Sequence, residues 1–390
     1  MNELQLLFLV LAALYLWECI HWLPRGSVAC LTWLGKKWCV RRPGQFSGNQ
    51  HGGIVLAWPL PPLGSIVAGN PLPFTLSPQG LSGGKLNGLL PLAGINTVET
   101  RGRKVYLNGK PAFKFPTQTY AVLVTRQLLE LKNEKPDRRG AAIEKMVQSM
   151  FDTKAIETRW KEFKGRTRNI QWLGNGLFFY LFCYAPAMIY RFGLVRTWLP
   201  LLIGMLAFTI SLAIMCYRVH KYFFPAADDD RFTHFITVLL APATAMRGRD
   251  FLSRRLLETY HPLAVVGEFC TPQAFRAFAE KTLRDLRYTI TPSYSDKEVA
   301  RKEAEIFSRQ TLLRTMENFL RRNKLDPDEL CGAPKREETC QSFCPRCLTQ
   351  FTTIDGQCAD CGGVPLVALK TVSKEVPAGK TAATRSSSRS

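Results

Sequence analysis

Four cysteines near the C-terminus have the spacing of a metal site. Two residues separate Cys344 from Cys347, and two separate Cys358 from Cys361. A Cys-x-x-Cys segment forms a tight turn that directs both thiolates at one ion, and two such turns complete a tetrahedral shell of sulfur ligands. Four thiolates leave no coordination position open for water. The spacing therefore predicts one structural zinc ion rather than a catalytic one.

The residues between and after these cysteine pairs favour short strands and tight turns. Residues 349–354 are β-prone, and Asp355-Gly356 is a turn dipeptide that allows the chain to reverse. Two glycines follow the last cysteine and relieve backbone crowding there. Residues 364–369 predict a further strand, which Pro365 places at a sheet edge.

With this pattern, residues 344–369 resemble a zinc ribbon, and the resemblance covers these residues only. Zinc ribbons are similar to one another across many functions: some bind nucleic acid, some bind protein, and many only stabilise a chain terminus. Arg346, at the tip of the first cysteine pair, and Phe351, on the predicted ribbon, are candidate contacts with a partner or with nucleic acid. Cys331 and Cys340 lie upstream without metal spacing and are expected to be free thiols.

Three apolar segments determine where the rest of the chain lies. Residues 4–23, 170–190 and 198–217 are each about 20 residues long, the length of a helix that crosses ~30 Å of hydrocarbon. Residues 191–197 are too few for a domain, so the second and third segments form a helical hairpin. A signal peptide is the alternative for the first segment, but no basic residue precedes its apolar core. The sequence therefore predicts three transmembrane helices.

The orientation of these helices follows from the distribution of Lys and Arg. No basic residue precedes the first segment, five lie in residues 24–42, and four lie in residues 161–168. The hairpin tip has only Arg191 and Arg196. The positive-inside rule then places the N-terminus outside, and the C-terminus and both large hydrophilic segments in the cytoplasm.

The hydrophilic segments divide into five parts. Residues 24–52 are a basic juxtamembrane segment. Residues 53–150 combine short apolar runs with an Asn108-Gly109 hairpin turn and then a helical pattern, which predicts a small α+β domain. Residues 151–169 form a basic amphipathic helix, and residues 231–330 have helical patterning throughout. Residues 370–390 are a basic, Ser/Thr-rich tail that is expected to be disordered.

The net charge of +21 favours anionic partners. In a membrane protein, anionic lipid at the cytoplasmic face satisfies this preference, and nucleic acid is the alternative. The chain has twelve cysteines, of which four have metal spacing and the others are scattered, a pattern typical of a reducing compartment.

The chain lacks the spacing of a phosphate-binding loop, a zincin helix or a nucleophile elbow. We therefore expect a multi-domain membrane protein with three transmembrane helices, a small α+β cytoplasmic domain, an all-α cytoplasmic domain and a C-terminal zinc ribbon. The predicted function is a membrane-anchored scaffold or regulator that docks a cytoplasmic protein. The alternatives are a membrane-tethered nucleic-acid-binding protein and a membrane enzyme of unknown reaction.

Overall fold

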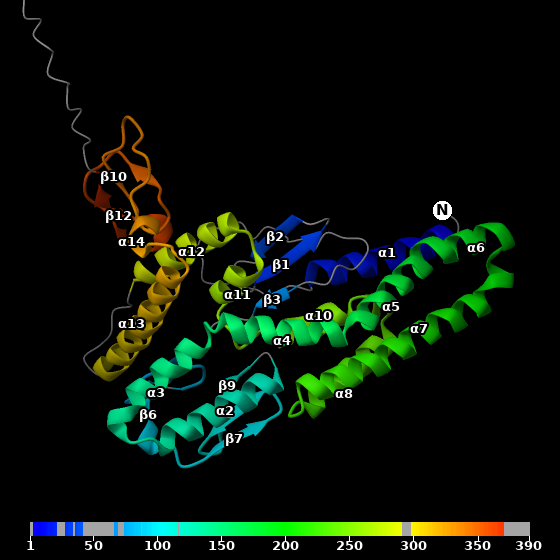
Figure 1. The fold of residues 1–390 in the computed structure, drawn as a ribbon, viewed down its shortest axis with the longest axis horizontal. Helices are drawn as coiled ribbons and strands as arrows, with labels where there is room; N and C mark the ends of the chain where they lie inside the picture. Colours follow the sequence, from blue (N-terminus) through cyan, green and yellow to red (C-terminus); the bar gives the residue numbers. More distant parts are fainter. Residues whose placement is uncertain are drawn as a thin grey trace, which may run out of the picture. The chain divides into compact units, whose positions relative to one another are not determined.

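The computed structural model forms two compact units, a main unit (Met1–Cys331) and a terminal unit (Gly332–Ser390). Within them, the structure describes residues 3–21, 28–33, 36–41, 66–68, 74–86, 88–115, 117–290 and 298–369. The predicted tail, residues 370–390, and most of the predicted segment 24–52 lie outside the described residues. The fold is mostly helical with small sheets, as the ribbon in Figure 1 shows.

The helices of the main unit differ widely in length. The longer ones are α1 (Glu3–His21), α2 (Gln118–Asn133), α3 (Pro136–Ser149), α4 (Thr153–Arg166), α5 (Arg168–Phe179), α7 (Leu194–Phe223), α8 (Asp228–Leu240), α12 (Pro272–Arg287) and α13 (Val299–Arg322). The shorter ones are α6 (Ala185–Phe192), α9 (Pro242–Met246), α10 (Gly248–Leu256), α11 (Pro262–Phe269) and α14 (Pro327–Leu330).

The helices α5, α6 and α7 form a long hairpin. Residues 168–192 make one continuous helix in which a π-helical segment, Tyr180–Tyr184, joins α5 to α6. Pro186 has no amide hydrogen and crowds the preceding turn, which explains why the helix widens just before it. Gly193, with a φ of 79°, then turns the chain directly into α7.

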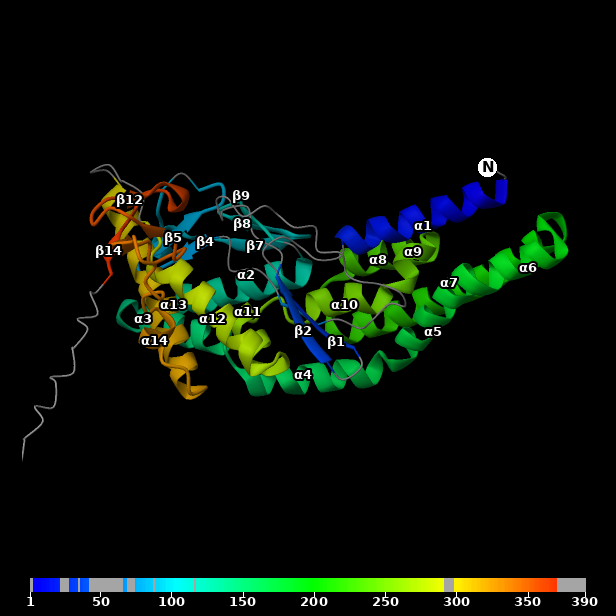
Figure 2. The ribbon, with the colours of Figure 1, turned by 90° about the horizontal axis from the view of Figure 1, so that it is seen from above.

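Among the described residues, two helices are long and apolar enough to cross a membrane, Arg168–Phe192 and Leu194–Phe223. The first predicted span is also a helix, α1, and its described part includes the apolar segment Phe8–Trp17. α1 extends in the same direction as the hairpin (Figures 1 and 2). It contacts the hairpin through Tyr15, whose ring centroid lies 5.5 Å from that of Phe178. The described chain thus has two apolar helices of spanning length, with α1 packed beside one of them.

Before α2, the described residues form three small antiparallel sheets. They contain β1 (Val28–Trp33), β2 (Lys36–Arg41) and β3 (Ile66–Ala68) in the order β2-β1-β3, then β4 (Phe74–Leu76), β5 (Gly80–Gly83) and β6 (Leu90–Pro91), then β7 (Val98–Arg101), β8 (Lys104–Leu107) and β9 (Lys110–Lys114). The predicted hairpin turn between β8 and β9 is present. Asn108 and Gly109 both have positive φ, at 50° and 75°, as a type I′ turn requires.

Segments from the front and the back of the chain share one core. α13 packs against α3 and against β4, so residues predicted to belong to two separate cytoplasmic domains lie together in the main unit. Phe151, just after α3, has its ring centroid 5.3 Å from that of Phe319 in α13. The boundaries predicted at residues 53–150 and 231–330 remain predictions.

Part of this core is polar. Arg247 and Asp250, at the start of α10, form a buried ion pair with an Nη2–Oδ2 distance of 2.7 Å and side chains only 4% and 3% exposed. The Arg249 Nε donates to the Thr167 hydroxyl at 3.1 Å, between α4 and α5. Burial lowers the pKa of Arg249, and the nearby Asp250 carboxylate partly offsets this effect. One carboxylate thus stabilises two buried guanidinium groups.

The contact between α5 and α9 depends on the absence of a side chain at Gly174. A Cβ built there would lie 2.7 Å from the backbone oxygen of Met246. We expect Gly174→Ala to destabilise the protein by about 1–3 kcal/mol, because a backbone oxygen cannot move aside as a flexible side chain can.

Gly165, in α4, provides the matched control, because a Cβ added there would meet no heavy atom within 4 Å. Gly165→Ala should stabilise the helix by about 0.5–1 kcal/mol. Thermal unfolding in detergent should therefore give midpoint shifts of opposite sign for the two variants. An unchanged midpoint for Gly174→Ala would contradict the close backbone approach.

Candidate metal centre

The four cysteines of the predicted metal site lie together in the terminal unit. Their sulfur atoms are all within 4.8 Å of one another. Cys344 and Cys358 are fully buried, whereas Cys347 is exposed and Cys361 is half-buried. Among the residues that the structure describes, no other group of three or more His, Cys, Asp and Glu side chains is arranged to hold an ion. The cluster can therefore hold one metal ion.

The distances within the cluster fit zinc. The Cys347 and Cys358 sulfurs are 3.7 Å apart. Zinc–sulfur bonds of about 2.3 Å in tetrahedral geometry place sulfurs about 3.8 Å apart. A disulfide would require a separation of about 2.0 Å, so these cysteines are not paired covalently. Four sulfur donors around one point are typical of a structural zinc site.

Two tight turns direct the thiols inward. In the first, the Leu348 amide donates to the Cys344 carbonyl at 2.8 Å, and Leu348 takes a positive φ of 65°. In the second, Gly362 and Gly363 have φ values of 73° and 96°. The Gly363 amide donates to the Cys358 carbonyl at 2.9 Å, which closes this turn. The predicted role of the two glycines, relief of backbone crowding after the last cysteine, agrees with this geometry.

Short strands support the turns. β10 (Ser342–Phe343) lies between β11 (Gln350–Phe351) and β14 (Val367–Ala368), and β12 (Gln357–Cys358) pairs with β13 (Val364–Pro365). Pro365 lies on an edge, as predicted, because β13 has a single neighbour. Behind the sheet, Cys340, Phe343 and Leu369 form a small buried cluster. Few of the described apolar residues form the core of this unit, so a bound ion would contribute much of its stability.

The thiols differ in their acidity in the metal-free cluster. Burial raises the pKa of Cys358, and hydrogen bonds to Cys347 and Cys344 raise it further. Burial also acts to raise the pKa of Cys347, but hydrogen bonds, first those of Thr349, lower it to about 7. The Thr349 hydroxyl lies 3.2 Å from the Cys347 sulfur. Metal binding must therefore displace protons from these thiols, and the affinity of the cluster for a metal ion should fall as the pH falls.

The two predicted contact residues lie on this unit but not at the ion site. Arg346 is half-buried in the turn between Cys344 and Cys347. Phe351 is half-buried in β11, where its carbonyl accepts from the Gln341 amide at 2.8 Å. The sequence prediction missed Thr349 as a neighbour of the site and missed β10 altogether. No sequence signal marks Thr349, and a strand of two residues has no recognisable period.

Comparisons with known proteins add no relative: no family model, no curated protein and no solved structure matches this chain.

Proposed function

We propose that this chain is an integral membrane protein that docks a cytoplasmic protein through a C-terminal zinc ribbon. The observation that carries the proposal is the exposed apolar surface of the hairpin α5–α7. In the most apolar stretch of Arg168–Phe192 only 28% is buried, and in that of Leu194–Phe223 only 22% is buried. The core helices of a soluble protein would be mostly buried, whereas lipid-facing helices expose apolar side chains on the protein surface.

The exposed side chains have the distribution expected of a membrane hairpin. Trp172, Tyr190 and Trp198 are exposed aromatic residues near the ends of its helices, where amphipathic rings prefer the interface. Exposed aliphatic residues follow Trp198 along α7. The exposed members include Trp172, Tyr190, Val195, Trp198, Leu199, Leu202, Ile203, Leu206, Ile210 and Ile214.

In this proposal α1 is the third transmembrane helix. Its exposed side chains include Leu9, Leu14 and Trp17, each more than half exposed, which suits a lipid environment. Tyr15 is buried against the hairpin, so one face of α1 packs against protein and its remaining surface faces lipid.

The orientation in this proposal places the N-terminus outside and the C-terminus in the cytoplasm, following the positive residues before α5 and after α7. Lys164 and Arg166, in the last turn of α4, then lie where anionic lipid headgroups are available. If a reporter enzyme is fused after Ser390, only a reporter that functions in the cytoplasm should be active. Activity of an extracytoplasmic reporter at that position would contradict the orientation.

The membrane assignment predicts a strong effect for a charge at the centre of α7. Leu206 is 41% exposed there. Leu206→Arg should cost about 2.5–3.5 kcal/mol of membrane insertion, because a guanidinium must enter hydrocarbon. The measurement is the fraction of protein that stays in membranes after alkaline carbonate extraction.

Val195→Arg is the matched control, because Val195 is 86% exposed at the hairpin tip, where a cation can reach water. Equal extraction of the two variants, with both folded, would contradict a membrane-spanning hairpin.

The role of the terminal unit in this proposal is docking. A closed four-sulfur shell offers a metal no position for substrate, so the ion organises a surface rather than a reaction. Ile354 and Val367 provide apolar groups on this unit, at 55% and 45% exposed. Arg346 and Phe351 remain the proposed polar and aromatic contacts.

A crosslinked pull-down from membranes tests the docking role. The intact chain is compared with a Cys344→Ser, Cys347→Ser variant, and both protein and nucleic acid are identified in the captured material. We expect one protein partner to disappear with the variant. Cys331→Ser is the control, because Cys331 is a free thiol outside the cluster. An unchanged set of partners would reject the ribbon as a docking surface, and loss of RNA or DNA instead would favour the nucleic-acid alternative.

A further inference from the structure

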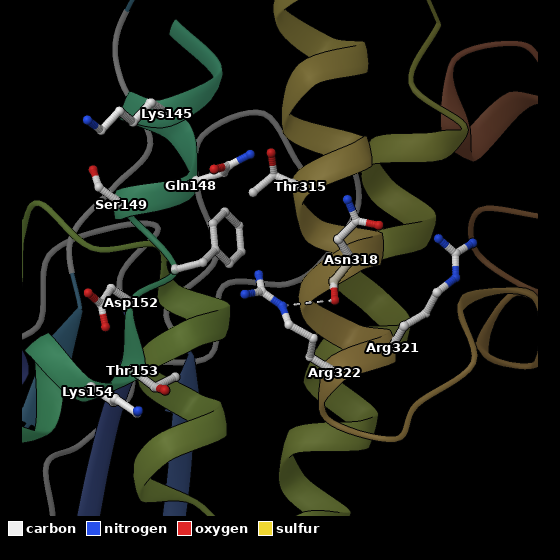
Figure 3. A pocket seen from close by; sticks show the side chains of 11 residues that line it. Lys145, Gln148, Ser149, Asp152, Thr153, Lys154, Thr315, Asn318, Arg321 and Arg322 are labelled. Atoms are coloured by element: carbon white, nitrogen blue, oxygen red, sulfur yellow. Dashed lines mark hydrogen bonds between the residues drawn. The ribbon is translucent and has the colours of Figure 1, made fainter. Parts of the chain in front are cut away.

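A cleft of about 850 Å³ opens between the α3–α4 corner and the last turns of α13. One side comes from the end of α3 and the start of α4, and the other comes from α13, more than 160 residues later in the chain (Figure 3). Among the residues that the structure describes, its lining includes four cations, Lys145, Lys154, Arg321 and Arg322, and one carboxylate, Asp152. The cleft is therefore strongly basic.

The single carboxylate does not neutralise these cations. Asp152 caps α4, where its Oδ1 accepts from the Ala155 amide at 3.0 Å. Among the residues that the structure describes, Lys145 and Lys154 form no ion pair, and Arg322 donates only to the Asn318 carbonyl, at 3.3 Å. Arg321 has a loose contact of 3.8 Å with Glu317. That carboxylate is already bound by Arg287 at 2.6 Å.

The position of Lys154 argues against a purely structural role for this charge. Arg321 and Arg322 lie in the last turn of α13, where cations complement the helix dipole. Lys154 lies in the first turn of α4, where the dipole disfavours a cation. A bound anion would make the electrostatic interaction favourable, because the start of the helix and the ammonium group would both attract the anion.

Neutral donors accompany the cations. The Thr153 hydroxyl and the side-chain amide of Gln148 line the cleft, whereas the Ser149 hydroxyl there donates to the Met146 carbonyl at 2.7 Å. Figure 3 shows the Arg322 guanidinium reaching from α13 into the space toward α4, whereas Arg321 extends toward the other side of its helix. A guanidinium, an ammonium and a hydroxyl group around one open space match the oxygens of a phosphate group.

We infer that this cleft binds a phosphorylated small solute, with Arg322 and Lys154 as its principal anion contacts. A volume of about 850 Å³ is within the ordinary range of small-molecule sites. The cleft offers binding groups and no free acid–base pair, so the ligand is bound rather than transformed. This inference does not depend on the docking role of the terminal unit.

A phosphate can also belong to a lipid headgroup, but the position of the cleft favours a soluble ligand. α4 has 14 residues and runs from the cleft toward the start of α5. At 1.5 Å per residue, this helix separates Lys154 from the proposed membrane hairpin by up to about 20 Å. A free phosphate compound can reach such a cleft without leaving water.

Titration of the full-length protein in detergent with inorganic pyrophosphate tests the inference by calorimetry. We expect binding that weakens with added salt and that weakens roughly tenfold or more in a Lys154→Gln, Arg322→Gln variant, which loses two charge-assisted contacts. The matched control is Arg138→Gln, Lys302→Gln. It removes one exposed arginine and one exposed lysine from α3 and α13, away from the cleft.

A second readout uses the native chain and so does not depend on the folding of a variant. Pyrophosphate should slow the labelling of Lys154 by an amine-reactive reagent and leave Lys302 unaffected. Absence of pyrophosphate binding, or equal loss of binding in the control variant, would overturn the inference. Binding only to phosphatidylcholine vesicles that contain phosphatidic acid, lost with Lys154→Gln, Arg322→Gln, would reassign the cleft to a lipid headgroup.

Discussion

Replacing Cys358 by serine is expected to reduce the zinc content of the purified protein from about one ion per chain to nearly none and to unfold the terminal unit. Cys358 is fully buried, and its sulfur lies 3.7 Å from that of Cys347. Structural zinc contributes roughly 10–16 kcal/mol in small zinc-dependent units, far more than the few apolar residues behind this sheet can supply. Elemental analysis and limited proteolysis between Gly332 and Leu369 measure the two effects.

The control for this experiment is Cys340→Ser, in the same unit but outside the four-sulfur cluster. Cys340 is buried, so this variant is expected to lose some stability while keeping its ion. A chelator should reproduce the effect of Cys358→Ser on the native chain. Gently purified native protein with well under one zinc per chain would reject the metal assignment.

The second large effect is expected from Asp250→Asn, at the buried ion pair of α10. Asparagine keeps the shape of the side chain but removes the charge that Arg247 and Arg249 share. Leaving a buried guanidinium uncompensated costs about 3–5 kcal/mol. The midpoint of denaturant unfolding in detergent should fall accordingly, because both arginine side chains remain buried in the folded state.

A double variant separates the charge from the packing. In Arg247→Met, Asp250→Leu, the pair is replaced by apolar side chains of similar length, a change that is often neutral or stabilising for buried pairs. This variant should recover the part of the lost stability that is due to Arg247, whereas Arg249 stays buried without the Asp250 carboxylate. Equal destabilisation of the single and double variants would show that hydrogen bonding and shape, rather than charge, make Asp250 important.

Local patterns were sufficient to predict those features whose residues are close in sequence. The four cysteines share two turns within 18 residues, and Asn108-Gly109 forms its turn from two adjacent residues. In each case the residues are neighbours along the chain, so their spacing in the sequence is enough to predict the local geometry. The helical hairpin follows from hydropathy in the same way.

Contacts between distant segments could not be predicted. The cleft requires residues 145–154 and 315–322 to face each other, and the Arg249–Thr167 hydrogen bond joins α10 to the end of α4. Neither contact leaves a periodic pattern or a fixed residue spacing in the sequence, because each depends on how whole helices pack. The first predicted span is a further example. α1 is helical as expected, but its packing against the hairpin through Tyr15 depends on which helices meet, which hydropathy does not encode.

The contact between α1 and the hairpin has a consequence for the synthesis of the protein. Tyr15 packs against Phe178, which follows it by 163 residues. At 5–20 residues per second, a ribosome needs roughly 8 to 33 seconds to produce that partner. During this interval α1 has emerged and its aromatic face has no hairpin to cover it. The first helix must therefore spend this time in the bilayer or with a cellular factor that shields it, and slower translation of residues 16–178 would lengthen that exposure.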